Sequence, residues 1–189
     1  FLMSFISQVT ISIVIYYIMR VSLKHEKSLY TASLIAAISY VVIYLSTYDL
    51  INLLPTVHFM VTGLSLLFIF IAYNEIIILE RKVRKIKKGE LVSLDSFSVE
   101  KSYKIVFKLL GLGLIFLSFA LISGFSMQSI FTANIVFKSL FTIIAWLIYV
   151  ITLIGIKYFN FPIKYATRSL FVAMWAVLIA YFMNSFIVN

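Results

Sequence analysis

The sequence contains no cysteine among its 189 residues. Disulfides, zinc–thiolate sites, iron–sulfur clusters and haem attachment through thiols therefore cannot be supplied by this chain. Charged residues are also scarce, at 12% of the chain, whereas soluble proteins average about 25%. These shortages exclude an ordinary soluble domain.

Hydrophobic residues make up 63% of the chain, and the mean hydropathy is +1.09. Six stretches without any charged residue are each near or above the ~18 residues that a membrane-spanning helix requires. A soluble helix keeps a polar face, and a transmembrane barrel alternates apolar and polar residues, so neither explains these runs. The sequence predicts an all-α, polytopic membrane helix bundle with six transmembrane helices. The stretches are residues 1–19, 28–48, 50–74, 109–137, 139–156 and 169–189.

The sixteen Lys and Arg side chains outnumber seven acidic ones and give a net charge of +9. Fifteen of them lie in three alternate segments, 20–27, 81–108 and 157–168, and only Lys138 lies elsewhere. This distribution follows the positive-inside rule, by which basic loops stay in the cytoplasm. It predicts that both termini face outward and that residues 81–104 form a cytoplasmic basic loop.

The most concentrated positive charge is the run at residues 81–88, which we expect to continue the preceding helix until Gly89 ends it. Anionic lipid headgroups are the expected partners of such a run beside a membrane span. Nucleic acid is not expected, because no stacking aromatic residues are interleaved with the charge and no recognisable module is present.

No internal repeat, low-complexity segment or separate soluble domain interrupts the sequence, so residues 1–189 are predicted to form a single transmembrane helical domain. The first residue is Phe rather than Met and lies inside an apolar run. We therefore expect the sequence to be a fragment that lacks N-terminal spans.

Two polar features mark the third predicted span. His58, Thr62 and Ser65 follow helical spacing, so they share one face, which should look toward other helices. Glu75 lies near the cytoplasmic boundary of the same span. An ionisable residue in a span is a functional candidate by default, but a structural ion pair with a nearby Lys or Arg is the favoured interpretation here.

The fifth predicted span carries the most regular polar stripe, at spacings of 4, 3, 4 and 3 residues, formed by Lys138, Thr142, Ala145, Tyr149 and Thr152. Lys138 is the single exception to the charge rule. Either it snorkels to the outer headgroups, or it is the counter-ion of an anionic ligand. Trp146 and Trp175 both lie mid-span, away from the usual interfacial belt. We expect them to face the interior.

No enzymatic constellation is present. The sequence has no Gly-x-Ser-x-Gly elbow, no His-Glu-x-x-His motif and no Gly-rich phosphate loop, so we expect no catalytic activity. A lone imidazole and a lone outward lysine among aromatic residues would suit haem, with His58 as iron ligand and Lys138 beside a propionate. A hydrogen-bonded, unliganded His58 is the alternative.

Several short segments occur in an order and spacing that resemble the cytochrome c assembly (CcsA/CcmC/HemX-like) membrane family. They are Val57-His58-Phe59, the sequence Leu-Ser-Phe-Ala-Leu-Ile-Ser-Gly at 117–124, Lys138-Ser139, Ala-Trp-Leu-Ile-Tyr at 145–149, and Ala180-Tyr181-Phe182. The resemblance covers the chain from about residue 30 to its end. It departs from the family in two respects: the tryptophan-rich haem-presenting segment is missing, and Phe137 replaces a second histidine found in many relatives.

This resemblance implies a multi-pass protein of the bacterial inner (plasma) membrane, with about eight spans in its relatives. It implies a non-catalytic role in haem handling or cytochrome maturation, with haem as cofactor and cytochrome c assembly proteins as partners. His58 would be the metal ligand, and the cofactor-binding residues would be His58, Lys138, Thr142, Trp146 and Tyr149. The alternatives are a small-molecule transporter and a scaffold for a membrane complex.

Overall fold

A computed structural model describes residues 2–23, 28–47, 53–89, 99–127, 133–159 and 162–186. Within these ranges every regular element is an α-helix, and five of the helices, α1 to α5, are long and apolar enough to cross a membrane. The all-helical prediction is confirmed, whereas the sixth span and the side on which the termini lie stay predictions. The helices are α1 (Leu2–Ser22), α2 (Ser28–Thr47), α3 (Leu53–Lys87), α4 (Val99–Ser126), α5 (Ala133–Tyr158) and α6 (Ile163–Phe186).

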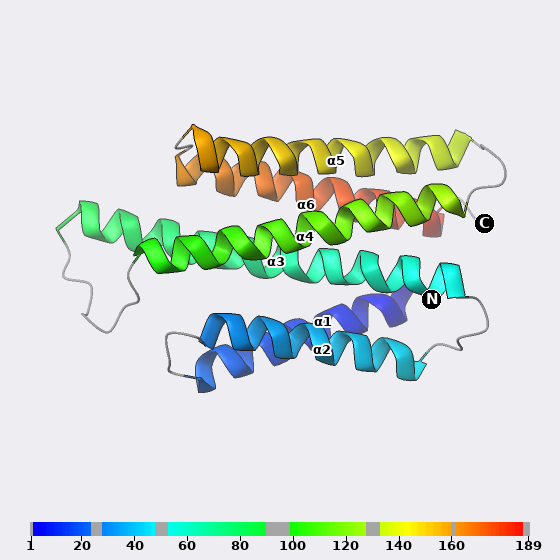
Figure 1. Cartoon of the computed structure of the whole chain (residues 1–189), viewed down its shortest axis with the longest axis horizontal. Coiled ribbons are helices and arrows are strands. Elements are labelled where there is room, and N and C mark those ends of the chain that lie inside the picture. The colour runs from blue at the N-terminus through cyan, green and yellow to red at the C-terminus, as the bar shows by residue number, and fades with distance from the viewer. Residues whose placement is uncertain are drawn as a thin grey trace.

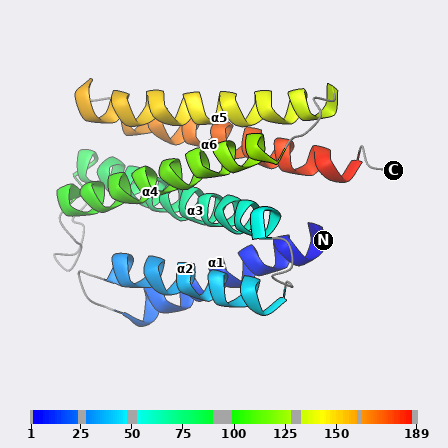
Figure 2. The same ribbon diagram turned by 45° about the vertical axis from the view of Figure 1, so that its right-hand side comes forward.

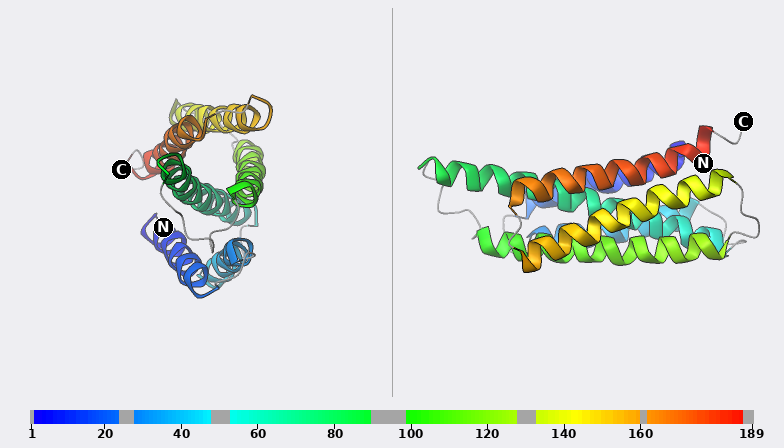
Figure 3. Two further views of the ribbon diagram at one scale, coloured as in Figure 1. Left: turned by 90° about the vertical axis from the view of Figure 1, so that its left-hand side faces the viewer. Right: turned by 90° about the horizontal axis from the view of Figure 1, so that it is seen from above.

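The six helices form two groups (Figure 1). Helices α1 and α2 pair as an antiparallel hairpin, while α3 packs most extensively on α4, and α5 on α6. Viewed end-on, α3 to α6 surround a common axis and the hairpin lies beside them against α3 (Figure 3). The turned view in Figure 2 shows the same separation. The hairpin is therefore attached to the four-helix group mainly through α3.

Helix α3 is far longer than a single membrane crossing. Its 35 residues span about 52 Å, against roughly 30 Å of bilayer hydrocarbon. Its basic end projects beyond the neighbouring helices (Figure 1), and Gly89 follows at a positive φ of 74°, a conformation that commonly ends helices. The expected continuation of the helix through the basic run is confirmed.

The segment predicted as a basic loop at 81–104 is partly helical. Residues 81–87 belong to α3, and α4 already begins at Val99, while 90–98 lie outside the described residues. Lys, Arg and Glu are good helix formers. Charged residues in the sequence therefore show where a span leaves the membrane, but they do not show where the helix ends.

Small residues set the closest approaches between helices. Gly63 of α3 contacts the side chain of Tyr40 of α2. A Cβ atom at this glycine would lie 1.9 Å from the Tyr40 hydroxyl oxygen and 3.0 Å from the ring of Phe5. Tyr40 is completely buried. This contact holds the hairpin against α3 at one point along its length.

Trp175 corrects an expectation. It was predicted to face the interior, but its side chain is 49% exposed and makes an edge contact with Phe171. The buried face of α6 is formed by the small residues Ala173 and Ala176, which allow neighbouring helices to approach closely. Trp175 consequently lies on the outer side of the helix.

Candidate functional site

His58 lies near the start of α3 and points toward α4. Its Nδ1 atom is 2.9 Å from the Oγ of Ser123. Its ring packs on Gly124, where a Cβ would lie 3.1 Å from Cε1. Ser65, two turns further along, donates a hydrogen bond to the Gly113 carbonyl at 3.1 Å. The expected inward orientation of this polar face of α3 is confirmed at both positions.

The hydrogen bond between His58 and Ser123 can run in either direction. The Ser123 hydroxyl also has two backbone acceptors, the carbonyls of Phe119 at 2.8 Å and Ala120 at 3.2 Å. A hydroxyl has one hydrogen to donate. In the tautomer that carries its proton on Nδ1, His58 donates to Ser123 Oγ, Ser123 donates to the backbone, and the imidazole lone pair is on Nε2. In the other tautomer, Ser123 donates to Nδ1.

The predicted stripe of α5 faces the bundle interior. Ala145, Tyr149 and Thr152 are buried, and Thr142 is half-buried. Trp146 donates from Nε1 to the Oγ of Ser118 at 2.9 Å. The expected interior position of Trp146 is confirmed. The Lys138 side chain lies outside the described side chains, so its predicted role stays a prediction.

The predicted site residues contact α4 at three separate levels. His58 meets Ser123 and Gly124, Trp146 meets Ser118, and Tyr149 lies beside Gly113. Five residues of helix correspond to about 7.5 Å of rise, so these contacts follow one another along α4. The hydrogen bond and the ring contacts described for His58 go to α3 and α4.

One apolar cleft lies elsewhere, among helices α3 to α6 toward their basic end. Its enclosed volume of about 10 Å³ holds at most one water molecule, so it is no cofactor pocket. Within the described ranges no three His, Cys, Asp or Glu side chains are grouped as metal ligands. Among the described side chains, His58 offers an imidazole nitrogen that could serve as one axial ligand of a haem iron. Residues lining the cleft include Ile76, Leu79, Tyr103, Phe107, Leu110 and Ile156.

Tyr149 has a buried hydroxyl with no hydrogen-bond partner in the described part of the chain. The side chain is 0% exposed. A buried polar group without a partner costs about 1–3 kcal/mol. The hydroxyl lies 3.5 Å from the position that a Cβ of Gly113 would take, so the close approach of α4 leaves it no nearby acceptor.

Tyr149→Phe is therefore expected to leave stability unchanged or to raise it by up to about 1 kcal/mol. Tyr16→Phe is the matched control, because the Tyr16 hydroxyl donates to the Glu75 carboxylate; its loss should cost about 1.5–3 kcal/mol. Equilibrium unfolding in detergent micelles measures both. A clear loss of stability in Tyr149→Phe would show that the hydroxyl has a partner.

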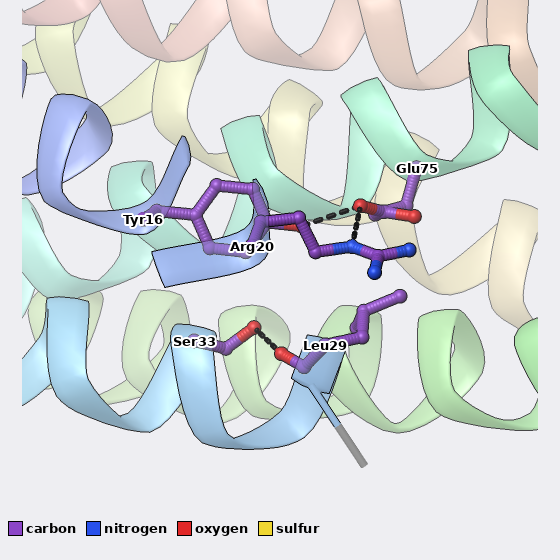
Figure 4. Close-up of polar contacts among 5 residues, drawn as sticks. All are labelled: Tyr16, Arg20, Leu29, Ser33 and Glu75. Atoms are coloured by element: carbon purple, nitrogen blue, oxygen red, sulfur yellow. Dashed lines mark hydrogen bonds and ion pairs between the residues drawn. The ribbon is translucent and has the colours of Figure 1, made fainter. Parts of the chain in front are cut away.

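The sequence predicted that Glu75 forms an ion pair but did not identify its partners. Glu75 is only 5% exposed, and its Oε1 atom accepts hydrogen bonds from the Tyr16 hydroxyl at 2.5 Å and from Arg20 Nε at 3.2 Å (Figure 4). Both donors come from α1. The sequence position of Arg20 could have identified it as the partner. Arg20 directly follows the first charge-free stretch and Glu75 directly follows the third, so both lie at the same, basic end of their spans.

Comparisons with known proteins give no match: the chain matches no family model, no curated protein and no solved structure. Its function must therefore be inferred from its own residues. The two features that such an inference can use are the oriented imidazole of His58 and the buried carboxylate of Glu75.

Proposed function

We propose that this chain is a haem-handling membrane protein that assists cytochrome c assembly, binding or presenting haem without catalysing a reaction. The observation that supports this proposal is the hydrogen bond between His58 Nδ1 and Ser123 Oγ. Metal-ligating histidines typically donate their other ring N–H to a fixed acceptor, which orients the ring and raises its basicity. The resemblance of the sequence to the cytochrome c assembly family points the same way.

The contribution of this chain is one positioned ligand. Ser123 orients the ring of His58 through its contact with Nδ1, and Gly124 leaves room for the ring against α4. When bound, haem supplies an iron that accepts a nitrogen lone pair. The other proposed contacts, Lys138, Thr142, Trp146 and Tyr149, lie on α5, so a partner protein or a rearrangement of α5 against α4 would complete the site.

The proposed setting is the bacterial inner membrane, crossed by six spans of this chain with both ends outward. Cytochrome c assembly proteins are the proposed partners. The basic side chains at 81–88, most of them exposed, would hold anionic headgroups, because this segment begins where the apolar part of α3 ends.

Haem loading of the detergent-purified protein tests the His58 assignment. The wild type is expected to show a Soret band that His58→Ala abolishes. Ser123→Ala should keep the ligand but lower haem affinity about 10–100-fold, as loss of a supporting hydrogen bond typically does. His25→Ala, at the other histidine of the chain, is the matched control and should bind like the wild type.

An absent Soret band after loading, or an unchanged one in His58→Ala, would remove His58 as the ligand. The alternatives, a small-molecule transporter and a scaffold for a membrane complex, require no haem at His58. The same titration therefore separates them from the proposed function.

A further inference from the structure

Glu75 combines burial within a membrane-spanning helix with an unequal use of its two oxygens. Both hydrogen bonds from α1 end on Oε1, and no hydrogen bond between described residues reaches Oε2. Arg20, at the basic end of α1, is 24% exposed, so the cluster is reached from that end of the bundle. Oε2 is therefore the carboxylate oxygen that is free to bind a proton.

The ionised form of Glu75 depends on the α1–α2 hairpin. A buried carboxylate is costly unless it is paired and hydrogen-bonded, and here one hairpin helix supplies both the cation and the hydroxyl donor (Figure 4). If Oε2 takes up a proton, the ionic attraction to Arg20 is lost. Proton uptake and hairpin docking are consequently linked equilibria that oppose each other.

Among the described side chains of the neighbouring helices, the other charged groups are positive and the remaining titratable groups are phenols, while Glu100 of α4 lies outside the described side chains. Tyr17 of α1 also interacts electrostatically with Glu75. On α2, the nearby Ser33 hydroxyl donates to the Leu29 carbonyl (Figure 4). At the same end of the bundle, the helices packed on α3 carry Lys104 and Lys108 on α4 and Lys164 and Arg168 on α6.

The second acidic side chain described on α3 behaves differently. Glu80 accepts from Arg84 at 2.9 Å and from Thr167 of α6 at 3.1 Å, so both of its oxygens are used. It connects α3 to the four-helix group and not to the hairpin. Glu80 therefore offers a matched control for Glu75.

We propose that Glu75 is a proton-binding site inside the membrane and that protonation of Oε2 loosens the α1–α2 hairpin from α3. A hydronium ion at the basic end of the bundle supplies the proton: one of its O–H bonds breaks, an O–H bond forms on Oε2, and a water molecule is released. Tyr16 continues to donate to Oε1, while the ionic attraction between Glu75 and Arg20 is lost. This site is independent of His58 and of haem.

The absence of cysteine makes a distance measurement direct. Cysteines introduced at the exposed positions Val42 on α2 and Leu147 on α5 carry spin labels in lipid nanodiscs. The label-to-label distance is recorded from about pH 4 to about pH 9, a range that covers ordinary and strongly shifted carboxyl groups. We expect the distance distribution to lengthen or broaden reversibly on acidification.

Glu75→Gln should show the acid-type distribution at every pH, whereas Glu80→Gln should keep the wild-type response. A distance that does not change with pH in the wild type, or an unchanged response in Glu75→Gln, would overturn the proposal. Infrared spectra of the same samples give a second measurement that needs no hairpin movement. The other acidic side chains of the chain also become protonated toward pH 4, so the part of the protonated-carboxyl band that belongs to Glu75 is the part that is lost in Glu75→Gln. A band that grows equally in the wild type and in Glu75→Gln would also overturn the proposal.

Discussion

Gly63→Ala is expected to destabilise the protein by about 3 kcal/mol, at the upper end of the usual cost of overpacking a core. The added methyl group would lie 1.9 Å from the hydroxyl oxygen and 2.3 Å from Cζ of Tyr40. Tyr40 is fully buried, so its ring has no open space to enter. The hairpin must therefore move away from α3 to accept the substitution, and equilibrium unfolding in detergent measures the loss.

Gly111→Ala is the matched control for this prediction. Gly111 also lies inside a helix, but nothing lies within 4 Å of the position that its Cβ would take. The substitution should raise stability by roughly 0.5–1 kcal/mol, because alanine favours a helix more than glycine does. In the double variant Gly63→Ala/Tyr40→Ala the combined loss should be smaller than the sum of the two single losses; additive losses would contradict the clash.

Arg20→Gln is expected to cost about 3 kcal/mol, because removing one partner of a buried ion pair leaves the other charge uncompensated. Glu75 remains 5% exposed with only the Tyr16 hydroxyl to stabilise its charge. Partial exposure of Arg20, at 24%, keeps the expected loss at the lower end of the range measured for such pairs. Unfolding measured at neutral pH provides the test.

Two comparisons make the Arg20 prediction specific. In Arg20→Gln/Glu75→Gln no charge is buried, so stability should return to within about 1 kcal/mol of the wild type. Arg84→Gln removes an exposed pair with Glu80 on the surface of α3 and should cost no more than about 0.5 kcal/mol. A double variant that is as unstable as Arg20→Gln alone would show that Arg20 acts through something other than the Glu75 charge.

The helices themselves were predictable because the bilayer restricts them strongly. A charge-free run of some twenty residues has few alternatives to a helix, since every backbone polar group must be hydrogen-bonded internally. The end of α3 at Lys87, just before Gly89, was predicted from the one residue there that adopts a positive φ without strain. Helix ends within charged segments were less predictable, as the start of α4 at Val99 shows.

Contacts between the helices were not predictable in the same way. Arg20 and Glu75 are 55 residues apart, and nothing local in either segment specifies the other. The outward orientation of Trp175 was missed for a related reason. Lipid and protein interior are both apolar, so the hydrophobic pattern of a spanning helix does not distinguish its two faces, and only the small residues Ala173 and Ala176 indicate the packed one.

For the candidate site, the sequence predicted which side chains face other helices, but it did not predict which of those side chains meet. The helical spacing of His58 and Ser65 correctly placed them toward other helices, and the polar stripe of α5 at Ala145, Tyr149 and Thr152 is buried as well. Whether two inward faces meet depends on the order of helices around the bundle. Here α4 lies between them, and the sequence contains no signal for that order.

The attachment of the α1–α2 hairpin through α3 also has a consequence for biosynthesis. Arg20 is translated 55 residues before Glu75, and ribosomes add about 5–20 residues per second, so the hairpin precedes its counter-charge by roughly 3–11 seconds. During that interval Glu75 is not present to pair with its guanidinium. The ion pair that joins the hairpin to α3 can therefore form only after Glu75 has been synthesised.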